Sequence, residues 1–293
     1  MPAYLWLALA GSALHGFSFA WSRQLVGYTT NRLKIAFYTL LSCTVLAATA
    51  APFVGFGGLM KAPQYIAGMT VSIIVSQALL MEALRRADAS FVVPMLGIKI
   101  FVVAVMTAWL FSEIYGPLVY LAAFGAFGSL FLLNDARLRT SPGGLLCVIG
   151  ASAAFACNDI FLMLQLRAGY TAGEVFIYSF LGPALVLVPL SAWLLRGEWG
   201  VSPPLLRGLA IYAVVHIAGV VLLMLAFDIG RRATMINIVQ NARGLFSIAV
   251  VFALARLGLS GFERLSRRQL RLRVSGALLM SGSLALAVLA APH

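Results

Sequence analysis

The chain resembles itself when it is shifted by 146 residues. Residues 82–87 read Glu-Ala-Leu-Arg-Arg-Ala, and residues 228–233 read Asp-Ile-Gly-Arg-Arg-Ala. Each copy closes one long apolar segment and precedes another, and five such segments fall in each half of the chain. Two halves of five hydrophobic segments are typical of a duplicated membrane transporter, whose site lies between the repeats.

The composition is that of a chain built for a lipid bilayer. Of the 293 residues, 62% are hydrophobic and 10% are charged, whereas soluble domains carry about 25% charged residues. We therefore expect an all-α integral membrane protein, because lipid offers no hydrogen-bond partners to the backbone. The net charge of +12 fits cationic loops retained in the cytoplasm. No nucleic-acid partner is expected, since no soluble domain is present to carry one.

Ten segments have the length and composition of membrane-spanning helices, which need about 20 mainly apolar residues. They are residues 3–22, 33–55, 64–84, 89–111, 116–134, 144–166, 173–195, 206–227, 233–255 and 273–291. Because five is an odd number, the second half must be inserted upside down relative to the first. We expect two inverted five-helix repeats, residues 1–140 and residues 141–293.

Lysine and arginine are distributed unevenly between the two sides of the expected bundle. The loops after odd-numbered spans hold 15 of the 21 cationic residues, and the loops after even-numbered spans hold four. By the positive-inside rule, the odd-numbered loops face the cytoplasm and both termini lie outside. The expected location is the inner (cytoplasmic) membrane, which the chain crosses several times.

Four segments carry a family resemblance. They are A-D-A-S-F-V-V-P-M at 87–95, Glu113 at the close of the fourth span, R-G-L-F-S at 243–247 and F-E-R-L at 262–265. In these the chain resembles the drug/metabolite transporter superfamily, in its ten-span EamA-like branch. The resemblance covers essentially the whole chain. It implies two EamA-type repeats, a central cavity and transport of small organic solutes, and it implies cytoplasmic termini, opposite to the charge count.

Polar residues gather on one face of the ninth span if that span is a continuous helix. At about 100° per residue, this face holds Asn237, Gln240, Asn241 and Arg243. A polar stripe in an apolar helix faces a cavity or another helix rather than lipid. The Arg243 guanidinium could bind a carboxylate or phosphate bidentately, or it could form an ion pair that locks two helices.

Other polar residues lie at membrane depth, where ionisable groups are costly and usually functional. Asp159, with Asn158 beside it, lies in the middle of the sixth span. Asp159 could carry a proton, bind an ammonium group or serve as the counter-ion of Lys99 or Arg243. Lys99 in turn could line the cavity or pair with Asp159. His15 could contact the substrate, relay protons or be a core histidine.

The sequence contains no G-x-x-x-x-G-K-[ST] loop, no nucleophile–base set and no metal-ligand cluster. We therefore expect neither an enzyme nor a cofactor. The favoured hypothesis is a secondary transporter of a small polar or amphiphilic metabolite, amino-acid-like or another organic solute with a negative group. It would work by alternating access, driven by a proton gradient or by exchange, as a monomer or a homodimer. The alternative is a translocator of a phosphorylated solute or a lipid-linked head group.

Overall fold

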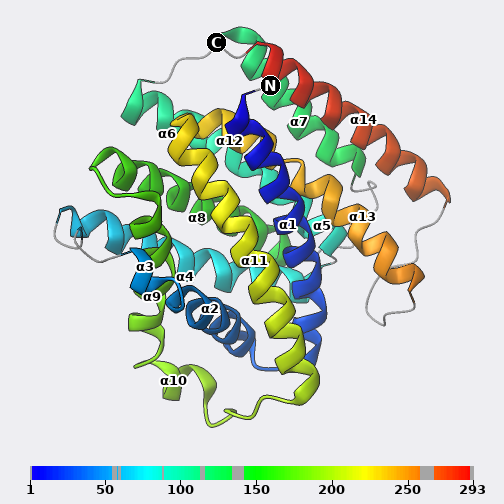
Figure 1. Cartoon of the computed structure of the whole chain (residues 1–293). Helices are drawn as coiled ribbons and strands as arrows, with labels where there is room; N and C mark the ends of the chain where they lie inside the picture. Colours follow the sequence, from blue (N-terminus) through cyan, green and yellow to red (C-terminus); the bar gives the residue numbers. More distant parts are fainter. Residues whose placement is uncertain are drawn as a thin grey trace.

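Helices form the architecture of the described chain (Figure 1). The computed structural model describes residues 2–54, 58, 61–87, 89–112, 116–133, 142–257 and 267–290, and within these residues there are helices and turns but no strand. The all-α expectation is thus confirmed for this part of the chain. The expected repeat boundary at 140 and 141 lies outside the described residues, as do Asp88, Glu113 and residues 262–265.

Each of the ten apolar segments contains helix within the described residues. The first half holds α1 (Ala3–Leu25), η1 (Val26–Tyr28), α2 (Arg32–Ala48), α3 (Ala51–Val54), α4 (Pro63–Arg86), α5 (Ala89–Met95), η2 (Leu96–Ile98), α6 (Lys99–Phe111) and α7 (Pro117–Leu133). The second half holds α8 (Pro142–Arg167), α9 (Ala172–Leu187), α10 (Ser191–Leu195), α11 (Pro203–Gly230), α12 (Ala233–Gln240), α13 (Arg243–Arg256) and α14 (Arg267–Leu289).

Six of the described helical segments are long and apolar enough to cross a membrane. They are Ala3–Tyr28, Pro63–Arg86, Phe91–Phe111, Pro142–Arg167, Pro203–Gly230 and Ala233–Arg256. Shorter apolar helices cover Leu33–Ala48, Pro117–Ser129 and Ala172–Leu187. Large apolar side chains such as Trp109, Phe124 and Leu185 are exposed, and soluble proteins rarely expose wide apolar surfaces. The structure is therefore compatible with an integral membrane protein.

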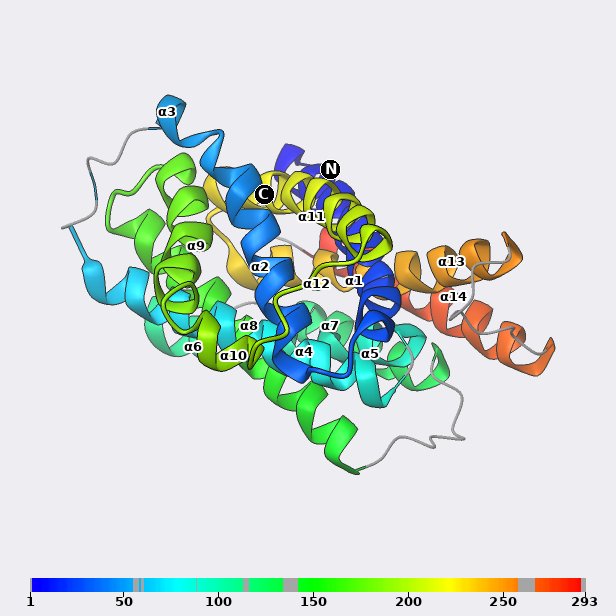
Figure 2. The same ribbon diagram turned by 90° about the horizontal axis from the view of Figure 1, so that it is seen from below.

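The main helix–helix contacts join the two halves of the chain. α1 packs along α11, α4 packs along α8, and α7 packs along α14. Figures 1 and 2 show α1 beside α11 near the middle of the molecule, and Figure 1 shows α7 and α14 together at one edge. α2 contacts both α9 and α11, and α4 also contacts α9. The halves are therefore interleaved rather than separate.

Two of the expected spans, 89–111 and 233–255, contain an interruption of the regular α-helix. In the first, the 3-10 turn η2 separates α5 from α6. Pro94 lies just before this turn, and its ring removes a backbone donor and disfavours the regular helix. In the second, residues 241–242 separate α12 from α13, and the Asn241 N–H bonds to carbonyls both three and four residues earlier. Such mid-helix 3-10 stretches often mark functional hinges.

The two interrupted helices cross each other closely. α5 contacts α13, and α6 contacts α12. A Cβ atom added at Gly244 would lie 3.0 Å from the Cα atom of Pro94, so the crossing leaves no room for a side chain there. The 3-10 turn η2 and the turn at residues 241–242 therefore lie in the middle of the bundle, directly before the first residues of α6 and α13.

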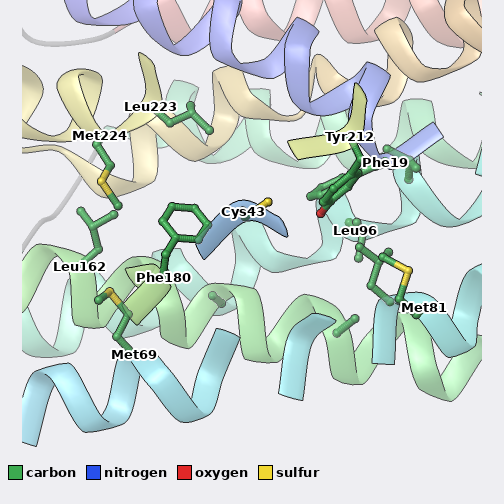
Figure 3. Packing of buried hydrophobic residues seen from close by; sticks show 14 of the residues in the cluster. Phe19, Cys43, Met69, Met81, Leu96, Leu162, Phe180, Tyr212, Leu223 and Met224 are labelled. Atoms are coloured by element: carbon green, nitrogen blue, oxygen red, sulfur yellow. The ribbon is translucent and has the colours of Figure 1, made fainter. Parts of the chain in front are cut away.

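One large apolar cluster holds the bundle together (Figure 3). Its buried side chains come from α1, α2, α4, α8, α9 and α11, among other elements. Examples from each of these six helices are Phe19, Cys43, Met69, Leu162, Phe180 and Tyr212. Since the same cluster includes helices of both halves, its packing fixes the halves relative to each other.

The contact of α1 with α13 depends on a glycine. A Cβ atom at Gly16 would lie 2.7 Å from the Arg243 carbonyl oxygen and 2.8 Å from the Phe246 Cβ atom. Because main chain cannot move aside cheaply, Gly16→Ala should lower stability by about 1–3 kcal/mol, as overpacking does. Gly128→Ala in α7 is the matched control, since nothing lies within 4 Å of its added Cβ. Equal thermal unfolding midpoints for both purified variants would contradict this packing.

Candidate functional site

A cavity lies between the two halves of the chain. Its empty volume is about 730 Å³ including its opening, and side chains of α1, α2, α4, α6, α8, α9, α11, α12 and α13 line it. The apolar wall includes Phe19, Phe155, Leu162, Phe180 and Met224, most of which belong to the cluster in Figure 3. The polar lining residues are His15, Ser76, Gln77, Lys99, Asn158, Asp159, Ser179, His216, Gln240 and Arg243. This composition, apolar with a few convergent polar groups, is typical of a small-molecule site.

The cavity brings together most of the candidates chosen from the sequence. Those that line it are His15, Lys99, Asn158, Asp159, Gln240 and Arg243. Asn237 and Asn241 are buried but do not line it. The expected polar face assumed one straight helix, whereas the turn at residues 241–242 divides it, so the side chains of α12 and α13 no longer follow a single 100° rotation.

Lys99 and Asp159 form a buried ion pair inside the cavity. Lys99 is the first residue of α6 and Asp159 lies in the middle of α8, and its Oδ2 atom is 2.8 Å from the Lys99 Nζ atom. The two residues are 2% and 5% exposed. A charge at this depth requires a partner, and each of these residues supplies one for the other. Asp159 therefore pairs directly with Lys99 rather than with Arg243.

Arg243 forms no direct ion pair among the described residues. It is the first residue of α13, is 2% exposed, and donates a hydrogen bond from Nη2 to the Leu96 carbonyl oxygen at 2.9 Å. Leu96 belongs to the 3-10 turn of the other interrupted helix, so Arg243 bridges the two interruptions. Its Nε atom has no hydrogen-bond partner, and the Phe19 ring centroid lies 5.9 Å from its guanidinium carbon.

The electrostatics of the cavity favour an anion. Lys99 and Arg243 each begin the second part of an interrupted helix, where the helix dipole adds partial positive charge. Asp159 cancels one of these two cations, which leaves one formal positive charge in excess. A buried cation without a partner is strongly disfavoured, and a carboxylate or phosphate on a bound solute would supply the missing negative charge.

Aromatic rings form a column along one side of the cavity. The rings of His15 and His216 are stacked with centroids 4.8 Å apart, and the rings of His216 and Tyr212 are stacked at 5.0 Å. The Phe19 ring contacts both histidines, with its centroid 5.4 Å from that of His15 and 5.7 Å from that of His216. The Ser18 Oγ atom lies 3.3 Å from Nδ1 of His216. The column joins α1 to α11 and presents flat apolar faces with polar edges.

Gln77 is a lining residue that the sequence analysis did not identify. Its Nε2 atom donates to the Thr39 Oγ1 atom at 3.0 Å and to the Tyr212 hydroxyl oxygen at 3.2 Å. It therefore connects α4 with α2 and α11 at the cavity wall. The polar pair Ser76-Gln77 in the middle of an apolar span was the signal that could have revealed it.

Several buried polar atoms in the cavity lining have no hydrogen-bond partner in the described part of the chain. They are Nδ1 and Nε2 of His15, Oδ1 of Asn158, Oε1 of Gln240 and Nε of Arg243. Buried polar groups are nearly always bonded, so these atoms are free to bond a solute or water.

Within the described residues, no group of three or more His, Cys, Asp or Glu side chains is placed to hold a metal ion.

Comparison with known proteins identifies a shared fold. No protein-family model and no curated protein matches the chain. Among solved structures, one described as "Crystal structure of protein" superposes with a TM-score of 0.66 and is 18% identical, over 97% of this chain and 98% of the other. At this level of identity the similarity shows the fold alone.

Proposed function

We propose that this chain is a secondary transporter that moves a small organic anion across the inner (cytoplasmic) membrane by alternating access, driven by a proton gradient or by exchange. The cationic cavity between the two halves carries this proposal. Its one excess positive charge calls for an anion, and its position is that of the substrate site in duplicated transporters. The resemblance to the EamA-like branch of the drug/metabolite transporters points to the same function.

Ten spans in two inverted repeats form part of the proposal, and the pattern of helix contacts supports it. Exchanging the five segments of one half for those of the other converts the helix pair α1–α11 into the pair α8–α4. Both of these pairs are in contact. In the same way α1 with α13 becomes α8 with α6, and α5 with α13 becomes α12 with α6. The pairs α2 with α9 and α7 with α14 map onto themselves. A two-fold relation between the halves accounts for all of these contacts.

The surface polar contacts repeat in the same way. Arg85 follows Glu82 at the end of α4 and donates to the carbonyl oxygens of Thr30 and Asn31. Arg231, its equivalent at a shift of 146 residues, follows Asp228 and donates to the Leu166 carbonyl oxygen. Each arginine thus ties the end of the third segment of its half to main chain at the end of the first segment or just after it. Two equivalent closures, one for each side of the membrane, are what alternating access requires.

The lining favours an amphiphilic monoanion over a phosphate ester. Lys99 is already neutralised by Asp159, so one excess positive charge remains for the solute. Phe19, Phe155 and Phe180 offer apolar surface to its body. The free oxygens of Asn158 and Gln240 could accept hydrogen bonds from hydroxyl, amide or ammonium groups on it. A translocated phosphate or lipid-linked head group would need Asp159 to release Lys99.

Counterflow in proteoliposomes tests the proposal. Labelled organic carboxylates should enter vesicles preloaded with the same unlabelled compound, and they should be recovered chemically unchanged. A thermal-shift screen first selects solutes, because a ligand of the folded state raises its melting temperature. Counterflow of phosphorylated solutes alone would favour the head-group alternative. Chemical conversion of the solute by the purified protein would overturn transport in favour of an enzyme.

A further inference from the structure

His15 is a buried residue whose ring is held in place while its nitrogen atoms remain free. The side chain lines the cavity and the residue is 6% exposed, and neither ring nitrogen has a hydrogen-bond partner among the residues that the structure describes. The rings of Phe19 and His216 stack against it, with centroids 5.4 Å and 4.8 Å away. Gly219 of α11 leaves room for it, since a Cβ atom there would lie 2.6 Å from His15 Cδ2. A fixed imidazole with a free edge has the geometry of a proton acceptor.

Charged groups from several helices surround this ring. Lys99 of α6 and Arg243 of α13 are cationic, Asp159 of α8 is anionic, and His216 and Tyr212 of α11 are the other titratable neighbours. Helices α5 and α12 contain no titratable residue, and those of α4 lie near its two ends. The fixed charges of the cavity thus sum to one positive charge, and Coulomb repulsion opposes a further cation at His15 while no anion is bound.

We propose that His15 is the proton-binding residue of the transport site, so that a proton and an anionic solute bind and cross together. The proposal rests on the transport function proposed above and selects the proton gradient over exchange as its driving force. The bound anion cancels the excess positive charge, and a free ring nitrogen of His15 then takes a proton from the side to which the cavity is open. On the other side the anion leaves and the N–H bond releases its proton. Because the coupling is reciprocal, protonation of His15 also strengthens anion binding.

The first experiment needs no solute. The chain has three histidines, so protein with isotope-labelled histidine in lipid nanodiscs gives few imidazole signals, and His15→Gln and His293→Gln assign them. In the unliganded wild-type protein at pH 6, His15 should be neutral. Arg243→Gln removes one positive charge, so it should raise the ratio of protonated to neutral His15 about tenfold. Arg243→Lys is the matched control that keeps the charge and should leave the ratio unchanged.

A protonated His15 in the empty wild-type protein at pH 6 would overturn the proposal without recourse to any variant. So would the same ratio in Arg243→Gln and Arg243→Lys. The second experiment uses a carboxylate that shows counterflow: His15→Gln should lower uptake driven by an imposed pH gradient by a much larger factor than it lowers counterflow. An equal loss of both, or a loss of neither, would overturn the coupling role. Since the first experiment involves no transport, failure of the proposed function and failure of this inference remain distinguishable.

Discussion

Arg243→Gln should abolish transport while leaving a folded protein. A buried charge that bonds a charged partner typically contributes 2–5 kcal/mol to binding, about 30-fold or more in affinity. We therefore expect counterflow to fall about 100-fold or below detection. Stability should not fall, because Arg243 has one hydrogen bond, to the Leu96 carbonyl oxygen, and no direct ion pair among the described residues. Counterflow and thermal unfolding of the same preparation measure both quantities.

Arg243→Lys separates charge from geometry. Lysine keeps the positive charge but cannot form the bidentate contact of a guanidinium with a carboxylate, so transport should fall less than in Arg243→Gln. If Arg243→Gln transports like the wild type, Arg243 is not part of the site, and the reason for expecting an anionic cargo is lost. If it unfolds the protein, the arginine is structural, since removal of a buried unpaired charge should not destabilise.

Asp159→Asn should strongly destabilise the protein. It leaves the Lys99 ammonium buried without its carboxylate, and breaking a buried ion pair typically costs about 3–5 kcal/mol. Replacing both residues, as in Lys99→Met with Asp159→Leu, should recover most of this loss, because the cost comes from the unpaired charge rather than from the absence of the pair. Unfolding midpoints of the single and double variants in one detergent give the coupling between the two residues.

A more exposed ion pair provides the control. Asp228 and Arg231 form a contact at 2.6 Å with side chains 36% and 46% exposed. Exposed pairs typically contribute about 0–1 kcal/mol, so Asp228→Asn should shift the midpoint much less than Asp159→Asn. Similar shifts for the two variants would mean that the Lys99–Asp159 pair is hydrated in solution. Water would then enter the cavity more freely than the burial of this pair indicates.

The positions of the helices were predictable from the sequence because their cause is local. A long apolar run such as 206–227 must satisfy its own backbone groups in lipid, and only a helix does so within one segment. Helix α11 accordingly covers this run and extends beyond both of its ends. The cavity candidates Lys99, Asp159 and Arg243 could be chosen for the same reason, since an ionisable group at membrane depth is costly wherever it lies.

Tertiary packing decided which of these residues meet. The sequence allowed Asp159 to pair with either Lys99 or Arg243, and the choice depends on how α6 and α13 pack against α8. The interruptions at 96–98 and 241–242 arise where two helices cross at Pro94 and Gly244. The spacing of hydrophobic residues along the chain does not reveal that crossing. A polar face drawn on a straight helix therefore wrongly assigned Asn237 and Asn241 to the cavity lining.

The stacked aromatic rings also separate what the local sequence determines from what tertiary packing determines. His15 and His216 were each visible as polar residues in apolar spans, but nothing local indicates that two rings 201 positions apart in the chain stack at 4.8 Å. That contact exists because Gly219 lets α11 approach α1. Hydropathy acts on one segment at a time and therefore determined the helices. The site depends on close contacts between segments distant in sequence, and only the folded bundle brings those segments together.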